Sequence, residues 1–148
     1  MTVTFFGHRT IVGAVEQKLK RVIIKLIEEN SADNFYIGNN GEFDKAAKNV
    51  LKEAKIKYPH IKYAVVLAYV PSKKSGTEEE ADTIVPEGIE SVLPKYAICA
   101  RNKWMLLHSD TVVTYVVTKT GGAARFKSVA EKMGKNMVDI CTQTESAD

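Results

Sequence analysis

The sequence predicts an α/β fold, a Rossmann-like three-layer sandwich with a mainly parallel sheet of about five strands. Short apolar runs alternate along the chain with longer segments whose apolar residues recur at helical spacing. The order is strand, helix, strand, helix, strand, a polar loop, and then helix, strand, helix, strand. The runs are apolar throughout instead of alternating with polar residues, which is typical of parallel strands covered by helices on both faces.

The first half of the chain contains two predicted strands and two predicted helices. The strands are Val3–Phe6 and Phe35–Ile37. The second helix ends near Pro59, because proline lacks an N–H and disfavours a helix before it. The apolar residues that predict the helices are Ile11, Val15, Leu19, Val22, Ile23, Leu26 and Ile27, and then Phe43, Ala46, Ala47, Val50, Leu51 and Ala54.

The second half starts with the longest apolar run, Ile61–Val70, which predicts a strand. The polar and charged segment Ser72–Asp82 is expected to be a mobile loop that closes over a ligand or only covers the surface. Thr83–Val85 predicts a short extra strand, and Thr111–Thr118 and Met137–Ile140 predict two more. Two helices are predicted by the apolar residues Val92, Leu93, Tyr96, Ala97, Ala100, Trp104 and Leu107, and by Phe126, Val129, Ala130 and Met133.

The composition is that of an ordinary soluble domain, with 45% hydrophobic and 26% charged residues in 148. This length predicts one domain over residues 1–141, followed by a flexible polar tail over 142–148. The net charge of +3 is small, and lysine and glutamate alternate along the first two helices, which argues against a nucleic-acid partner. Cys99 and Cys141 lie far apart in the sequence, so we expect no metal site and no disulfide framework.

The apolar runs also argue against a membrane protein. All are far shorter than the roughly 20 residues that span a bilayer. The N-terminus has no basic region and no signal-peptide cleavage site. We therefore expect a cytoplasmic protein, and the helical faces are compatible with a homo-oligomer.

Three glycine-containing turns follow predicted strands, at Gly7–Thr10, Gly38–Asp44 and Lys119–Arg125, and each is expected to lead directly into a helix. In parallel sheets, ligands bind at this edge, where free N–H groups and helix dipoles attract anions. Alternatively, these glycines only allow tight turns. Neither GxGxxG nor a P-loop motif is present. The candidate ligand-binding residues are Gly7, His8, Arg9, Gly38, Asn39, Asn40, Gly41, Asp44, Arg101, Asn102, Thr120, Gly121, Gly122 and Ala123.

Side-chain chemistry at these turns allows two interpretations. Arg9 requires a phosphate or a carboxylate such as Asp44 as its partner. His8 can donate to a phosphate or act as an acid or base, or it only packs in the turn. Glu42 and Asp44 begin a predicted helix, where they serve as helix caps or bind ligand hydroxyls.

The two asparagines of the second turn and two residues of the third predicted helix also allow two interpretations each. Asn39 and Asn40 suit a turn but also suit contacts with a ribose or base. Arg101 and Asn102 face either the ligand cleft or solvent.

Five segments together resemble a bacterial single-domain family within the SLOG superfamily, which includes DNA-processing protein A and the Lonely Guy enzymes. The likeness covers about Val3–Ile140. The segments are FFGHR at Phe5–Arg9, GNNGEFDKAA at Gly38–Ala47, YPHIKYAVVLAY at Tyr58–Tyr69, ARNKWM at Ala100–Met105 and TYVVTKTGGAARF at Thr114–Phe126.

The resemblance implies a Rossmann-like fold that binds nucleotides or nucleotide-derived ligands. It assigns Gly7 and Arg9 to the first ligand loop. Gly38, Gly41 and Asp44 belong to the second loop by the same match. It assigns Gly121 and Gly122 to the third, phosphate-binding loop.

The third loop departs from the PGGxGTxxE of Lonely Guy enzymes, because the corresponding run from Thr120 to Ser128 contains no glutamate. We therefore expect binding or sensing of a nucleotide-like ligand, with no other cofactor. The alternative is a hydrolase or transferase of nucleotide N-glycosidic bonds, with Glu42 or Asp44 as its carboxylate. A third interpretation is an oligomeric interaction module with a vestigial pocket.

Overall fold

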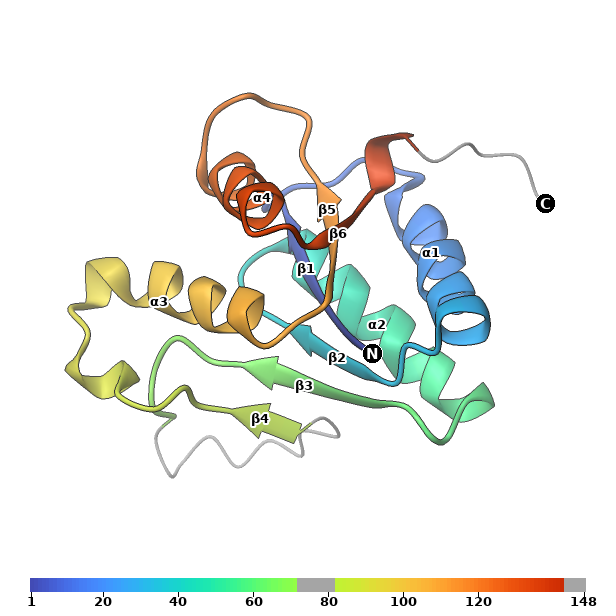
Figure 1. Ribbon diagram of the computed structural model, residues 1–148, viewed down its shortest axis with the longest axis horizontal. Coiled ribbons are helices and arrows are strands. Elements are labelled where there is room, and N and C mark those ends of the chain that lie inside the picture. Colours follow the sequence, from blue (N-terminus) through green and yellow to red (C-terminus); the bar gives the residue numbers. More distant parts are fainter. Residues whose placement is uncertain (72–81, 143–148) are drawn as a thin grey trace.

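One parallel sheet of six strands organises the protein, in the order β4-β3-β2-β1-β5-β6 (Figure 1). The computed structural model describes residues 1–71 and 82–142. Every neighbouring pair of strands is parallel. The strands are β1 (Thr2–Gly7), β2 (Asn34–Ile37), β3 (Lys62–Val66), β4 (Asp82–Ile84), β5 (Thr111–Tyr115) and β6 (Asn136–Asp139).

Helices cover both faces of the sheet, which confirms the predicted three-layer α/β architecture. In Figure 1, α1 and α2 lie on one face and α3 and α4 on the other. The helices are α1 (Val15–Asn30), α2 (Glu42–Lys57), α3 (Pro94–Leu107) and α4 (Gly122–Lys132), with short 3₁₀ helices η1 (Ile89–Ser91) and η2 (Ile140–Thr142).

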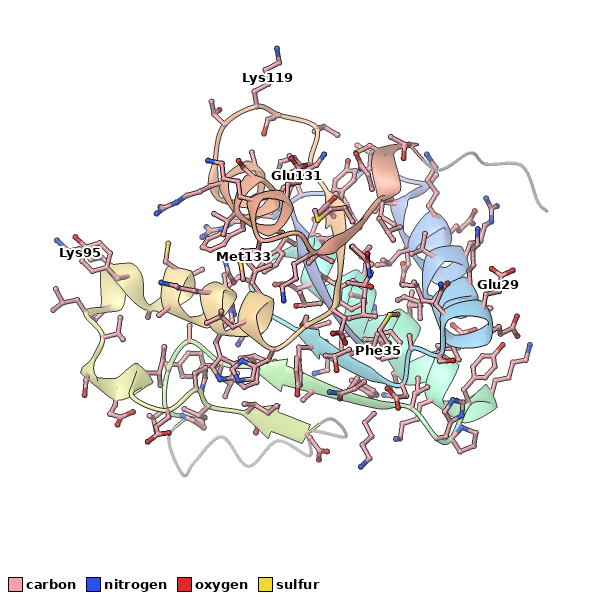
Figure 2. All side chains as sticks on the ribbon, viewed as in Figure 1. Glu29, Phe35, Lys95, Lys119, Glu131 and Met133 are labelled. Carbon is pink, nitrogen blue, oxygen red and sulfur yellow. The ribbon has the colours of Figure 1, made fainter. Side chains whose placement is uncertain are left out.

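Two adjacent phenylalanines of β1 anchor the two halves of the core. Successive side chains of a strand point to opposite faces of the sheet. Phe5 therefore lies in the layer of α1 and α2, where its ring stacks on Phe35 with 6.2 Å between centroids. Phe6 lies in the layer of α3 and α4 and stacks on Phe126 at 5.7 Å. Figure 2 shows Phe35 inside the molecule.

The structure corrects the number of strands and the ends of two of them. The sheet has six strands instead of about five, because the short extra strand predicted near Thr83 is β4. The strand predicted over Ile61–Val70 ends at Val66, since its neighbour β4 ends at Ile84 and offers no further ladder. β5 ends at Tyr115, three residues before the predicted Thr118.

Helix starts and the chain ends also differ from the prediction. α1 begins at Val15 instead of Ile11, and Gly13, whose residue type disfavours helix interiors, lies in the preceding turn. Thr142, predicted to belong to the tail, is part of η2. The predicted loop over 72–81 and the remaining tail, 143–148, lie outside the described residues. None of the helices in the described part of the chain has the length and apolar character that a membrane crossing requires.

Candidate functional site

A pocket of about 330 Å³ opens beside the carboxyl ends of β1 and β5. At this point the strand order reverses, since β2 continues the sheet on one side of β1 and β5 on the other. Such switch points are where ligands bind in open α/β sheets. The pocket is lined by Phe5, Phe6, Gly7, Arg9, Asn40, Asp44, Ile98, Arg101, Asn102, Met105, Gly122 and Ala123.

The structure brings eight of the predicted ligand-binding residues into this first pocket. They come from four separate segments of the sequence: Gly7, Arg9, Asn40, Asp44, Arg101, Asn102, Gly122 and Ala123. Sequence reasoning missed the apolar part of the wall, which is formed by Phe5, Phe6, Ile98 and Met105. In the sequence, these four apolar residues look like ordinary core residues. Only the crossing of α3 over the sheet shows that they also face a cavity.

Arg101 is the buried centre of the polar wall, with only 2% of its surface exposed. Its Nη1 donates to the Asn39 Oδ1 at 3.2 Å and to the Val66 carbonyl at 3.3 Å. Its Nη2 donates to the Asn40 Oδ1 at 2.9 Å, and its Nε to the Asn102 Oδ1 at 2.8 Å. A buried guanidinium held by this many acceptors is rigid, and it in turn fixes the three amides.

Asp44 is the acidic partner of this cluster. Burial raises the pKa of its carboxyl from 3.8 to about 6, against the lowering effects of the Asn40 N–H and of Arg101. The Asn40 N–H donates to Asp44 Oδ2 at 2.9 Å. The cation that acts on Asp44 is therefore Arg101 and not Arg9, the partner considered from the sequence, because Arg9 is exposed. A carboxyl with a pKa of about 6 exchanges protons near neutral pH.

Gly38 lies beneath both charged groups and is itself buried. A Cβ atom on Gly38 would lie 2.8 Å from the Asp44 Oδ2 and 3.0 Å from the Arg101 Cζ. Only a residue without a side chain lets the two groups approach the end of β2 this closely. Gly38 thus shapes the site without lining it.

The N-termini of α2 and α4 at this edge differ in whether their first backbone N–H groups are already hydrogen-bonded. At α2, the Glu42 N–H already donates to the Arg9 carbonyl at 2.8 Å. At α4, Gly121 is the N-cap residue and provides no side-chain cap. Within the described residues, no hydrogen bond occupies the N–H groups of Gly122 and Ala123, which both line the pocket. The open end of a helix dipole attracts anions, and at the first pocket the start of α4 is such an end.

The first glycine turn does not lead directly into a helix, contrary to the prediction. Residues 8–14 separate β1 from α1 and pack against the start of α2. The Glu42 carboxylate accepts the Ile11 N–H at 2.8 Å, so it holds this loop and does not line the pocket. Gly41 has a φ of 102°, and a Cβ there would lie 2.6 Å from the Arg9 Cα, so only glycine fits.

His8 joins two of the site loops. Its Nε2 accepts the Val117 N–H at 2.8 Å, and its ring packs edge-on against Tyr115 with 5.6 Å between centroids. This places His8 between the β1–α1 loop and the β5–α4 loop, outside the lining of the first pocket. The structure therefore favours the packing interpretation for this residue.

The remaining predicted residues of the third turn do not line the first pocket. The Thr120 carbonyl accepts the Thr118 hydroxyl at 2.8 Å, inside the loop itself. Thr120 and Gly121 are exposed and do not line the pocket. Figure 2 shows Lys119 extending outward from the tip of the same loop.

A second pocket of about 620 Å³ adjoins the first and shares Asn40 and Ile98 with it. The sequence predicted only the two asparagines of its wall. It is lined by Asn39, Asn40, Ala68, Tyr69, Val70, Ile89, Glu90, Val92, Pro94, Ala97 and Ile98. Among the described residues, no group of three or more His, Cys, Asp or Glu side chains is placed to hold a metal ion.

Fold and site together define a Rossmann-like α/β protein with a pocket of polar and apolar side chains at the switch point of a parallel sheet. Comparison with protein-family models and with curated proteins gave no match. Among solved structures, the chain is similar to DNA processing protein A (DprA) from Streptococcus pneumoniae, with a TM-score of 0.67 and 18% sequence identity. The similarity covers 93% of this chain and 49% of DprA, so the chain spans about half of that protein. At this identity the likeness concerns the fold.

Proposed function

We propose that the protein binds or senses a nucleotide or nucleotide-derived small ligand in the first pocket. The observation that carries this proposal is the pairing of two features in one cavity. The open N–H groups of Gly122 and Ala123 suit a phosphate, and the cluster of Arg101, Asn40 and Asp44 suits the hydroxyls of a sugar. The phosphate would lie at the start of α4, with Arg9 adding charge at the rim.

The size of the pocket favours a mononucleotide over a dinucleotide. Small-molecule pockets enclose roughly 300–1,000 Å³. The first pocket, at about 330 Å³, is at the lower end of that range. It therefore suits a phosphate with a ribose, and the base would extend beyond it.

The resemblance to the SLOG superfamily and the shared fold with a DNA processing protein support a nucleotide-related ligand. A nucleic-acid strand as ligand receives less support, because the net charge is only +3. Proteins that bind strands neutralise many phosphates with clustered cations.

The proposal is tested by calorimetric titration of the full chain with a panel of nucleoside monophosphates. Saturating binding is expected, and Ala123→Asp should abolish it, because a carboxylate at the start of α4 repels the phosphate. Ser128→Asp adds the same charge to an exposed position of the same helix and should leave binding intact. Absence of binding for every nucleotide, or equal binding by the Ala123→Asp protein, would contradict the proposal.

One observation favours hydrolysis of an N-glycosidic bond as a second candidate function. Asp44 lines the pocket with its pKa raised to about 6, and a carboxyl tuned in this way can protonate a leaving group. Incubation with nucleoside monophosphates would then release free base, detected by chromatography, and Asp44→Asn would stop the release. Binding without release of base by the wild-type protein would contradict the enzymatic function alone.

A further inference from the structure

The second pocket continues the first at the point where a bound nucleotide would leave it. The two cavities share Asn40 and Ile98, so a ligand anchored at α4 reaches the second pocket past these side chains. Most of the second wall is apolar, with Val92, Pro94 and the half-exposed ring of Tyr69. Such a wall suits the flat face of a base.

Arg101 determines which atoms the two asparagines present to this second pocket. A guanidinium has only donors, so each amide must turn its oxygen toward it. The distances are 3.2 Å to the Asn39 Oδ1 and 2.9 Å to the Asn40 Oδ1. Both amide nitrogens are therefore directed away from Arg101.

The two amide nitrogens have different environments. The Asn39 Nδ2 donates to the Tyr69 hydroxyl oxygen at 3.4 Å, which leaves the hydroxyl hydrogen for another acceptor. The Asn40 Nδ2 has no hydrogen-bond partner within residues 1–71 and 82–142. Both Asn40 and Tyr69 line the second pocket, so its polar wall offers two donors.

Glu90 completes the polar wall and, as a carboxylate, can only accept. A base edge that carries an oxo group beside an N–H satisfies both kinds of group. Guanine, hypoxanthine and uracil have this lactam edge. In adenine and cytosine an amino group replaces the oxo group and a bare ring nitrogen replaces the N–H. In the same orientation, the amino group of adenine or cytosine would face the donors of Asn40 and Tyr69. The lone pair of the ring nitrogen would face the Glu90 carboxylate.

We infer that the second pocket holds the base of the nucleotide and selects an oxo-bearing lactam edge over an amino-bearing one. Asn40 is the central specificity residue, Tyr69 supplies the second donor, and Arg101 is a positioning residue that acts through the Asn40 amide. This inference rests on the proposed binding of a nucleotide in the first pocket.

The test is calorimetric titration with matched ligand pairs, inosine against adenosine monophosphate and uridine against cytidine monophosphate. Members of a pair differ at the oxo or amino group and the adjacent ring nitrogen, and the phosphate and ribose stay the same. The oxo member of each pair should bind about tenfold more tightly, because a donor buried against a donor remains unpaired.

Asn40→Asp replaces the outward amide nitrogen by an oxygen of the same size. The other carboxylate oxygen takes the place of the amide Oδ1 and still accepts from Arg101, so the fold is retained. The preference should disappear or reverse in this protein. Asn102→Asp is the matched control, since it adds the same charge beside the same guanidinium at a residue that lines only the first pocket. Its affinity can fall, but the oxo member of each pair should still bind more tightly.

Tyr69→Phe keeps the aromatic ring and removes one donor, so it should reduce the preference without abolishing nucleotide binding. Equal affinities within both pairs, or tighter binding of the amino members by the wild-type protein, would overturn the inference and leave the proposed function standing. Failure of all four nucleotides to bind would overturn both.

Discussion

The Asp44 carboxylate and the Arg101 guanidinium both lie close to Gly38, the residue that directly follows β2. A methyl group at the α-carbon of Gly38 would lie 2.8 Å from the Asp44 Oδ2 and 3.0 Å from the Arg101 Cζ. Two residues 57 positions apart in the sequence are thus brought to the same glycine, and both line the first pocket.

Gly38→Ala should lower the free energy of unfolding by about 1–3 kcal/mol, because the new methyl group displaces both charged side chains. Urea denaturation measures the change. Gly13→Ala is the matched control, since a Cβ there has no atom within 4 Å, and it should leave the stability unchanged or slightly higher. Equal stabilities of the two variants would show that the contact over Gly38 is loose.

The raised pKa of Asp44 makes stability depend on pH with a defined sign. Between its unfolded value of 3.8 and its folded value of about 6, the folded protein binds more protons than the unfolded chain. The contribution of Asp44 to stability therefore falls as pH rises through this window. Asp44→Asn removes the charge, so it should stabilise the protein at pH 7 relative to wild type and show less benefit at pH 4.5.

Urea denaturation at the two pH values measures this difference directly. The opposite order, with the Asp44→Asn protein less stable than wild type at pH 7, would mean that Asp44 is held as an anion by Arg101 and that its pKa is not raised.

Arg101→Met should lower the free energy of unfolding by about 2–3 kcal/mol, because the Val66 carbonyl and the amide oxygens around Arg101 lose their donor. Lys103→Met replaces an exposed cation two residues further along α3 and should change stability by less than about 0.5 kcal/mol. Urea denaturation of the two proteins measures both changes in the free energy of unfolding. If both changes are small, the Arg101 guanidinium does not stabilise the fold.

His8→Ala should loosen the connection between two site loops, because the Val117 N–H loses the acceptor that lies at 2.8 Å. Faster amide hydrogen exchange at Val117 is expected, with exchange in the middle of α2 unchanged. An unchanged exchange rate at Val117 would show that the loop is held by other contacts.

The sequence predicted much of the fold because periodicity is a local property. The apolar stripes of α1 and α2 and the apolar strand runs identified the layers, and all three glycine turns lie at the carboxyl edge of the sheet. Strand ends were less predictable. Whether Leu67–Val70 continues a strand depends on the length of the neighbouring β4, which lies far along the chain.

The site could not be predicted from local sequence patterns, because it depends on contacts between distant segments. Arg101 lies on a helix with apolar residues on several sides, so its pattern did not show which face is buried. Its position over the ends of β2 and β3 depends on how α3 crosses the sheet. The second pocket was also hidden, because Tyr69 and Val92 belong to segments whose contact no spacing rule predicts.

An NMR titration of the ¹⁵N-labelled protein with inosine monophosphate shows whether a nucleotide binds between the start of α4 and the cluster of Asp44 and Arg101. Saturable shifts are expected for the Gly122 and Ala123 backbone amides and for the Asn40 side-chain NH₂. Amides around Lys25 in α1, beside a different cavity, should stay unshifted. Unchanged Gly122, Ala123 and Asn40 signals at saturating nucleotide, or shifts confined to other surfaces, would contradict nucleotide binding at this site.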